Sequence, residues 1–316
     1  MTRAFVTGVN GQDGSYLVDR LLADGVEVHA LAHALEPLPD LPEVHLHVGD
    51  VTASDEVRRL LLDVAPDEIY NLAAVSSVAR SWAEPELTGR VNGLAAAALL
   101  DAALAAQEKH GGQVRFVQAS SAEIFGEPDR SPQDESTPVR PVNPYGAAKA
   151  YAHLMVDVYR RRGLHAASLI LYNHESPRRP TQFVTRKITS TVAAIAQGRA
   201  STLALGNLEA RRDWGWAPDY VDAMVRAART ETPDDFVIAT GAGHSVRDFV
   251  AAAFEHAGVS DWEHRVVVDP DLVRPADATE LVGDASRART RLGWAPTLEF
   301  AQVVAEMVTA DLAPSA

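Results

Sequence analysis

Cysteine is absent from the 316-residue chain. The chain therefore has no disulfide framework and no thiolate chemistry, and a reducing cytoplasm is the expected compartment. Met1, Thr2 and Arg3 lead directly into an apolar segment, so we expect no secretory signal peptide. The alanine-rich run from Leu94 to Ala106 is interrupted by Asp101 and is too short to span a bilayer.

Lysine is also scarce, with three in the chain, and 43 acidic residues against 29 lysines and arginines give a formal net charge of −14. A protein this acidic is not expected to bind nucleic acid or an anionic membrane. An anionic ligand would need cations gathered locally in its site. With 47% hydrophobic and 23% charged residues, the composition is that of a folded protein with one large domain or two moderate ones.

Strand-like apolar segments alternate with helical patterns through the first 172 residues. This alternation predicts an α/β fold with a doubly wound parallel sheet, in which ligands bind beyond the carboxyl ends of the strands. Beyond Asn173 a helix and short mixed elements predict a smaller second domain. Strands are expected at 3–7, 26–32, 44–48, 68–72, 114–119 and 167–171, and helices at 15–24, 54–62, 94–108, around Tyr145 and at 183–197.

Three glycines, Gly8, Gly11 and Gly14, lie between the first expected strand and the first expected helix. Glycine permits a tight turn and lets the backbone approach a pyrophosphate at a helix N-terminus, where free amides and the helix dipole favour anions. The alternative is a plain tight turn, but the position between strand and helix favours dinucleotide binding. The spacing resembles the loop of short-chain dehydrogenases/reductases.

Tyr145 and Lys149 are four residues apart, and Ser121 lies upstream at the end of a strand. A tyrosine, with a pKa of about 10, loses its proton near neutral pH only beside positive charge, and Lys149 on the same helix face is expected to supply that charge. The Ser121 hydroxyl can hydrogen-bond the same substrate oxygen. The three residues predict a base for an alcohol that loses a hydride.

Longer motifs are more specific than this triad. They include Thr7-Gly-Val-Asn-Gly-Gln-Asp-Gly-Ser-Tyr-Leu17, Asn173-His-Glu-Ser-Pro-Arg-Arg179 and Arg212-Asp-Trp-Gly215, and shorter matches continue through Arg274-Pro275 to Leu292-Gly-Trp294. Over nearly its whole length the chain resembles the GDP-mannose 4,6-dehydratases, which are extended short-chain dehydrogenases/reductases with a Rossmann-like fold.

The resemblance implies an internal redox reaction on a GDP-hexose, with NADP as cofactor and NAD not excluded. Tyr145 would be the base during oxidation of the C4 hydroxyl, and the new ketone would acidify the C5 proton. Glu123 would remove that proton and help to expel the C6 hydroxyl as water, before the hydride returns to C6. Glu123 is also the only carboxylate close enough in sequence to Ser121 to face the same pocket. The enzyme would be a lyase.

The resemblance also implies the binding residues, and it assigns no metal ligand. Lys187, Arg212 and Arg274 would neutralise the diphosphate. The full substrate set is Ser76, Asn173, Val184, Lys187, Arg212, Arg274 and Asp277. The cofactor set is Gly8, Asn10, Gly11, Gln12, Asp13, Gly14, Asp50, Val51, Leu72, Ala73, Ala74, Tyr145, Lys149, His174 and Arg179.

The resemblance also implies two domains, each formed by two separate segments of the chain. Residues 1–172 and 213–242 would form the NAD(P)-binding domain, and residues 173–212 and 243–316 the nucleotide-sugar domain. Proteins of this kind are homo-oligomers. A dimer is expected here rather than the family tetramer, because the segment 32–37 lacks the arginines of the loop that helps to assemble the tetramer.

The same segment leaves the choice between NADP and NAD open, because the missing arginines neutralise the 2′-phosphate of NADP, and His33 is expected to be solvated. Other departures from the family are Ser121 for threonine, Ala122 for serine, Val75 for glutamine and Asp277 for glutamate. They leave open a reductase, epimerase or dehydratase acting on a different nucleotide sugar. Glu123 argues against an epimerase, and the Tyr145–Lys149 pair argues against a non-catalytic cofactor-binding regulator.

Overall fold

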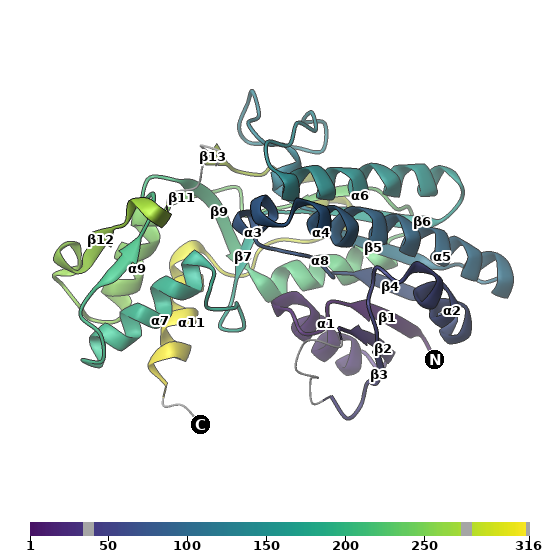
Figure 1. Cartoon of the computed structure of the whole chain (residues 1–316), viewed down its shortest axis with the longest axis horizontal. Helices are drawn as coiled ribbons and strands as arrows, with labels where there is room; N and C mark the ends of the chain where they lie inside the picture. Colours follow the sequence, from purple (N-terminus) through teal and green to yellow (C-terminus); the bar gives the residue numbers. More distant parts are fainter. Residues whose placement is uncertain (34–40, 273–279, 314–316) are drawn as a thin grey trace.

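The computed structural model describes residues 1–33, 41–272 and 280–313. Seven strands form a sheet in the order β10-β6-β5-β4-β1-β2-β3, and every neighbouring pair is parallel (Figure 1). This confirms the predicted doubly wound fold. The strands are β1 (Arg3–Thr7), β2 (Glu27–Ala32), β3 (His45–Val48), β4 (Glu68–Asn71), β5 (Arg115–Ala119), β6 (His165–Leu171) and β10 (Asp235–Ile238).

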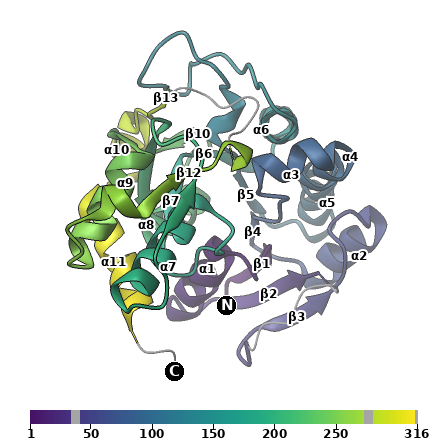
Figure 2. The same cartoon turned by 60° about the vertical axis from the view of Figure 1, so that its left-hand side comes forward.

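Helices cover both faces of this sheet, which explains why its inner strands are apolar on both sides (Figure 2). One face packs against α1 (Gln12–Ala23), α8 (Ala217–Arg229) and α10 (Ser286–Leu292). The other face packs against α2 (Ser54–Val64), α5 (Ala95–His110) and α6 (Pro144–Arg161). Two short helices, α3 (Val78–Ala83) and α4 (Pro85–Gly89), and a π-helical turn, η1 (Arg90–Leu94), lead into α5.

A second group of elements lies to the left of the large sheet in Figure 1. Its central strand, β9 (Arg211–Trp216), pairs with β7 (Asn173–Glu175), β11 (Gly243–Ser245) and β13 (Glu280–Leu281). Beside it, β8 (Leu203–Leu205) pairs with β12 (Val266–Val268). Three helices share one apolar core with these strands: α7 (Val184–Ala196), α9 (Val246–His256) and α11 (Phe300–Leu312). Short 3-10 turns complete the described chain: η2 (Ala122–Ile124), η3 (Trp262–Arg265) and η4 (Pro270–Leu272).

The chain passes between the two groups more than once. Residues of α10 and the following Trp294 join the core of the large sheet, although they come after most of the second group in sequence. The division into residues 1–172 with 213–242 and residues 173–212 with 243–316 therefore remains a proposal. No helix within the described ranges is both long and apolar enough to cross a membrane.

Candidate active site

The glycine loop connects β1 to α1 at the point where the strand order reverses between β1 and β4. Gly8 has a φ of +75°, and a Cβ there would lie 2.7 Å from the Ala73 nitrogen. A Cβ on Gly14 would collide with the Gly8 carbonyl oxygen. Gly11 is the N-cap of α1, with an extended backbone and no side-chain hydrogen bond to the first-turn amides. Such a helix start fits a pyrophosphate.

Side-chain hydrogen bonds tie together the strand ends around this loop. Thr7 Oγ1 donates to Asn71 Oδ1 at 2.7 Å and accepts from the amides of Leu72 and Ala73, each at 3.1 Å. Asn71 Nδ2 in turn donates to Gln118 Oε1 at 2.8 Å. These bonds fix the carboxyl ends of β1, β4 and β5 relative to one another. Directly after β4 come Leu72, Ala73 and Ala74, all half-buried.

A buried ion pair joins the glycine loop to β7. His174 Nδ1 contacts the Tyr172 carbonyl at 2.7 Å, and Nε2 contacts Asp13 Oδ2 at 2.9 Å. Both ring nitrogens face acceptors, an arrangement that favours the protonated form of His174. Burial lowers the pKa of His174, but the charge of Asp13 and the hydrogen bonds to Asp13 and the Tyr172 carbonyl together outweigh it, and the net pKa is raised. Gln12 strengthens this junction by bonding the His174 carbonyl and the Ser176 hydroxyl.

Gln12, Asp13 and His174 were assigned to the cofactor from the sequence. Their side chains bond to one another and to the His174 carbonyl. They therefore hold the start of α1, and with it the glycine loop, against β7. Asp50 and Val51 follow β3, at the same edge of the sheet as the glycine loop. A hydrogen bond from the Thr52 amide lowers the pKa of Asp50, and His33 Nε2 lies 4.0 Å from its carboxylate.

Tyr145 and Lys149 lie on the first turns of α6, which begins at Pro144 with Asn143 as its N-cap. Lys149 is buried, donates a hydrogen bond from Nζ to the Ala119 carbonyl at 2.8 Å and lies 5.9 Å from the centroid of the Tyr145 ring. The Ser121 hydroxyl is a hydrogen-bond partner of Tyr145. The charges of Glu123, Arg179 and Asp13 all affect the pKa of Tyr145. The structure thus brings the four predicted catalytic residues together with the loop.

The expected base lies in surroundings that raise its pKa in the free protein. Burial raises the pKa of Tyr145 to about 12, against the smaller lowering effect of the Ser121 hydrogen bond. Lys149 is not among the main causes of this shift, and its ammonium group donates to the Ala119 carbonyl. Burial also lowers the pKa of Lys149 itself, to about 8. Tyr145 is therefore a protonated phenol at neutral pH, close to a lysine that is still largely charged.

Glu123 is held by Asn143, which was not among the site residues predicted from the sequence. Asn143 Nδ2 donates to Glu123 Oε2 at 2.8 Å, and Asn143 Oδ1 accepts from the Gly146 amide at 2.7 Å. The same side chain therefore caps α6 and orients the carboxylate. The signal was present, because asparagine before proline at the start of a helix is a typical N-cap.

Arg179 follows β7 and lies near both the glycine loop and Tyr145. Its Nε is 3.4 Å from the buried Glu175 carboxylate, and its guanidinium stacks over the Phe183 ring at 3.9 Å. Its charge lowers the pKa of Asp13 and opposes the rise in that of Tyr145. Arg179 is thus the described arginine whose charge reaches both the glycine loop and the tyrosine.

The residues expected to bind substrate come from three places. Asn173 begins β7 and pairs in register with Trp214, while Arg212 is buried on β9. Val184 begins α7 and Lys187 lies one turn later, whereas exposed Ser76 follows β4 on the other side of the site. Arg274 and Asp277 lie outside the described residues. Asn10 is exposed within the glycine loop.

Comparison with known proteins places this site in a family. The family model described as GDP-mannose 4,6 dehydratase matches residues 5–307. The GDP-mannose 4,6 dehydratase of Cricetulus griseus is 42% identical, covering 98% of this chain and 91% of that protein. The enzyme of Vibrio cholerae is 41% identical, with coverage of 98% and 94%.

Solved structures agree on the fold. The UDP-glucose 4-epimerase of Thermus thermophilus, in complex with NAD, superposes with a TM-score of 0.84 at 28% identity, covering 98% of this chain and 99% of that one. The dTDP-glucose 4,6-dehydratase of Streptomyces venezuelae, with NAD bound, gives 0.83 at 26% identity and covers 98% and 96%. With a family match over nearly all its residues and relatives above 40% identity, the chain belongs to the GDP-mannose 4,6-dehydratase family.

Proposed function

We propose that the chain converts GDP-mannose to GDP-4-keto-6-deoxymannose by oxidation at C4, loss of water across C5 and C6, and reduction at C6. The observation that carries this proposal is the grouping of Ser121, Glu123 and Tyr145 around one point beside the glycine loop. A plain alcohol dehydrogenation needs the tyrosine and the serine. The added carboxylate is what an elimination needs.

Tyr145 takes the proton of the C4 hydroxyl, and Ser121 holds the same oxygen. Since burial raises the pKa of Tyr145 to about 12, the phenolate needs positive charge in the closed site. Lys149 carries such a charge below about pH 8. Its position 5.9 Å from the ring centroid lets it stabilise the phenolate without bonding it directly.

Glu123 then removes the C5 proton, which the C4 ketone has made acidic. The electron pair released from the C5–H bond forms the C5–C6 double bond as the C6–O bond breaks. The hydroxyl leaves as water with the proton that Glu123 collected. Asn143 fixes the carboxylate during both proton transfers through its 2.8 Å hydrogen bond.

A nicotinamide dinucleotide, when bound, would supply a hydride acceptor for C4 and a hydride donor for C6, and C5 would regain a proton from solvent in the second transfer. The uncapped start of α1 and the glycine loop fit its pyrophosphate. We assign NADP on the family resemblance, and NAD stays the alternative because residues 32–37 lack the arginines that neutralise a 2′-phosphate in the family. Residues 34–37 of this segment lie outside the described residues. Titration of the protein with NADPH and NADH, followed by nicotinamide fluorescence, decides between the two cofactors.

GDP would lie toward β9 and α7. Lys187 and Arg212 would supply cations for the diphosphate there. Arg274 and Asp277, which lie outside the described residues, are proposed as further ligands of the substrate. This arrangement would concentrate positive charge locally in a chain whose net charge is −14.

Mass spectrometry of GDP-mannose incubated with the protein and NADP tests the function. The proposal predicts loss of one water with no net rise in NADPH absorbance. Glu123→Gln should keep the carboxamide hydrogen bond but stop water loss, leaving reduced cofactor on the enzyme. An unchanged mass with both NADP and NAD would overturn the proposal and favour an epimerase, reductase or dehydratase of another nucleotide sugar, consistent with Val75 in place of the family glutamine.

We also propose a homodimer, formed through α6. Tyr151, Leu154 and Val158 lie along its outer face and are 42%, 56% and 47% exposed, respectively. Their spacing of three and four residues makes one apolar stripe. Light scattering after gel filtration should give a dimer, and Leu154→Glu should give a monomer; a monomeric wild type would contradict the proposal.

The cytoplasm is proposed as the compartment from the cysteine-free sequence.

A further inference from the structure

A group of imidazoles lies on one face of the sheet edge formed by β2 and β3. Glu27 and His29 are two residues apart on β2, and His45 and His47 are two residues apart on β3. Because side chains on a strand alternate between faces, each pair projects to one side of the sheet. The register places His29 directly opposite His45. Three imidazoles and one carboxylate therefore share a small area that the catalytic assignment does not use.

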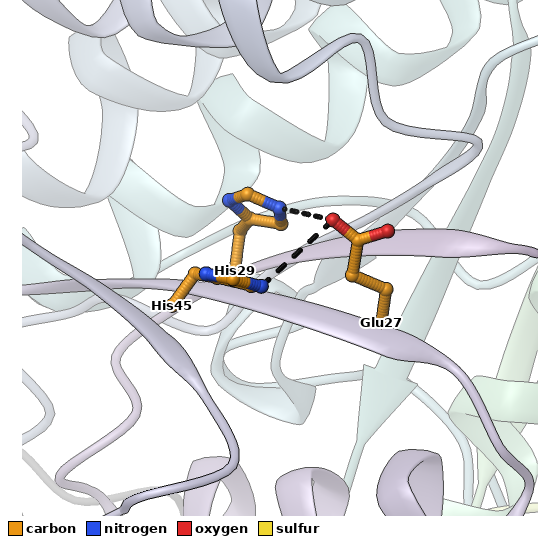
Figure 3. A group of neighbouring side chains, drawn as sticks. All are labelled: Glu27, His29 and His45. Carbon is orange, nitrogen blue, oxygen red and sulfur yellow. Dashed lines mark hydrogen bonds and ion pairs between the residues drawn. The ribbon is translucent and has the colours of Figure 1, made fainter.

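Three side-chain atoms in this group converge, as Figure 3 shows. His29 Nε2 lies 3.0 Å from Glu27 Oε1, and His45 Nε2 lies 3.9 Å from the same oxygen. One ligand atom from each of the three residues lies within 4.8 Å of the others. Bonds of about 2.0–2.1 Å in a tetrahedral zinc site put ligand atoms roughly 3.3 Å apart. A small rotation of the exposed His45 ring would close the set to that spacing.

His47 completes the arrangement from the other side of His29. His29 Nδ1 and His47 Nε2 are 3.0 Å apart, and their rings stack with centroids 5.3 Å apart. When His29 donates its Nδ1–H to His47, its Nε2 lone pair points at the Glu27 and His45 atoms. A histidine that binds a metal through one nitrogen and donates a hydrogen bond from the other is the usual arrangement in metal sites.

Glu27 also receives a hydrogen bond from Arg3 Nε, at 3.2 Å, on the same Oε1 atom. A carboxylate has two oxygens, so rotation of the Glu27 side chain can leave one for Arg3 and give the other to an ion. Arg3 then supports the carboxylate from the neighbouring strand, since it pairs in register with Glu27.

We propose that Glu27, His29 and His45 bind a divalent transition-metal ion of the zinc class, with water as a further ligand and His47 as the positioning residue. Two imidazoles and a carboxylate suit zinc better than calcium or magnesium, which prefer oxygen. The site lies at the start of β2, while the glycine loop lies beyond the carboxyl end of β1, so the ion clamps the edge strand β3 to β2 and takes no part in the sugar chemistry.

Zinc binding to tag-free protein tests this site directly. Chelator-treated protein is mixed with zinc sulfate, passed through a desalting column and analysed for metal by mass spectrometry. We expect about one zinc ion per chain, and at least a tenfold loss of affinity in His45→Ala and in Glu27→Gln. His45 is largely exposed, so its removal should leave the fold intact, as circular dichroism can verify. His264→Ala, an exposed histidine on η3, is the matched control.

Cobalt gives a second measurement, because its visible spectrum reports the coordination geometry of the bound ion. Cobalt bound to two imidazoles and a carboxylate should show the intense visible bands of tetrahedral coordination, which His45→Ala should abolish and His264→Ala should keep. Zinc should also raise the melting temperature of the wild type and not that of His45→Ala. The proposal is overturned if the wild type retains no zinc, if His45→Ala binds zinc as the wild type does, or if His264→Ala loses it.

Discussion

At the scale of single residues, burial decides the state of the catalytic groups. It raises the pKa of Tyr145 to about 12 and lowers that of Lys149 to about 8. The two effects leave a neutral phenol beside a charged lysine at neutral pH. Ser121, through its hydrogen bond, and Arg179, through its charge, are the groups that oppose the rise at Tyr145. The tyrosine is thus a weak base until further positive charge comes close.

Removing the phenolic hydroxyl tests the role of Tyr145. Tyr145→Phe keeps the ring and its packing, so cofactor affinity should change less than twofold. The rate of water loss should fall by about 10²–10⁴-fold, the usual contribution of a positioned base. Steady-state rates and NADPH titration measure the two quantities. Near-wild-type turnover in Tyr145→Phe would show that another group is the base.

The Asp13–His174 pair gives a pH dependence whose sign follows from the two shifts. The pKa of His174 is raised above 6.5 and that of Asp13 is lowered below 3.8. The stability that His174 adds is complete below pH 6.5 and is lost as the pH rises through its folded-state pKa. The stability that Asp13 adds is complete above pH 3.8 and is lost as the pH falls through its folded-state pKa.

His174→Gln should therefore lose about 3 kcal/mol of unfolding free energy near pH 5, the cost of breaking a buried pair. The difference from the wild type should shrink as the pH rises from about 6 to 9. Urea unfolding across this range measures it, and His264→Gln on the surface is the control. A difference that stays constant with pH would mean that His174 is neutral in the folded chain.

The motif residues could be predicted because their spacing carries the chemistry. Tyr145 and Lys149 are one helical turn apart, and Ser121 ends a strand, so a parallel sheet brings them together. The effect of Lys149 on Tyr145 could not be predicted, because it depends on the Ala119 carbonyl that holds the ammonium group. Arg274 and Asp277 lie outside the described residues, and their roles stay predictions.

At the scale of elements, the turn from β1 into α1 builds the proposed pyrophosphate site. The helix was expected to begin at Ser15, but it begins at Gln12, because Gly11 takes the N-cap position with an extended backbone. The short strand β7 was not expected at all. A segment of three residues has too little periodicity to be recognised, and its pairing with β9 is decided by distant residues. The π-helical turn η1 had no recognisable signal either.

A methyl group in the glycine loop tests this element. In Gly14→Ala the new Cβ would collide with the Gly8 carbonyl oxygen, so the loop must shift. Dinucleotide affinity should fall at least tenfold, about 1.4 kcal/mol. Gly112→Ala, where a Cβ meets no atom within 4 Å, is the matched control and should bind normally. Equal affinity in both variants, measured by NADPH titration, would separate this loop from cofactor binding.

The N-terminus of α6 has two functions in one side chain, and two substitutions separate them. Asn143→Ser keeps an N-cap oxygen but cannot reach Glu123, so stability should change little while the rate of water loss falls. Asn143→Ala loses both functions and should also cost about 1 kcal/mol of unfolding free energy. Thermal unfolding and turnover measure the pair. If Asn143→Ser kept full activity, the hydrogen bond to Glu123 would not matter for catalysis.

At the scale of the whole molecule, six strands of the large sheet and helix α7 were predictable, whereas β10 and most of the second group of elements were not. Strands buried on both faces, such as β6, give long apolar segments that alternate with helices. Elements beyond Asn173 are short, and their order in sequence does not follow their position in space. Trp294, for example, packs against α8 through its hydrogen bond to the Asp219 carbonyl. Such returns depend on tertiary contacts.

The position of the transferred hydrogen tests the central claim most directly. GDP-mannose carrying deuterium at C4 is converted by the protein with unlabelled cofactor, and the product is examined by deuterium NMR and mass spectrometry. Internal transfer predicts that the product has lost water and carries the deuterium at C6. Deuterium found in the free cofactor or lost to water, or an unchanged sugar, would contradict the account.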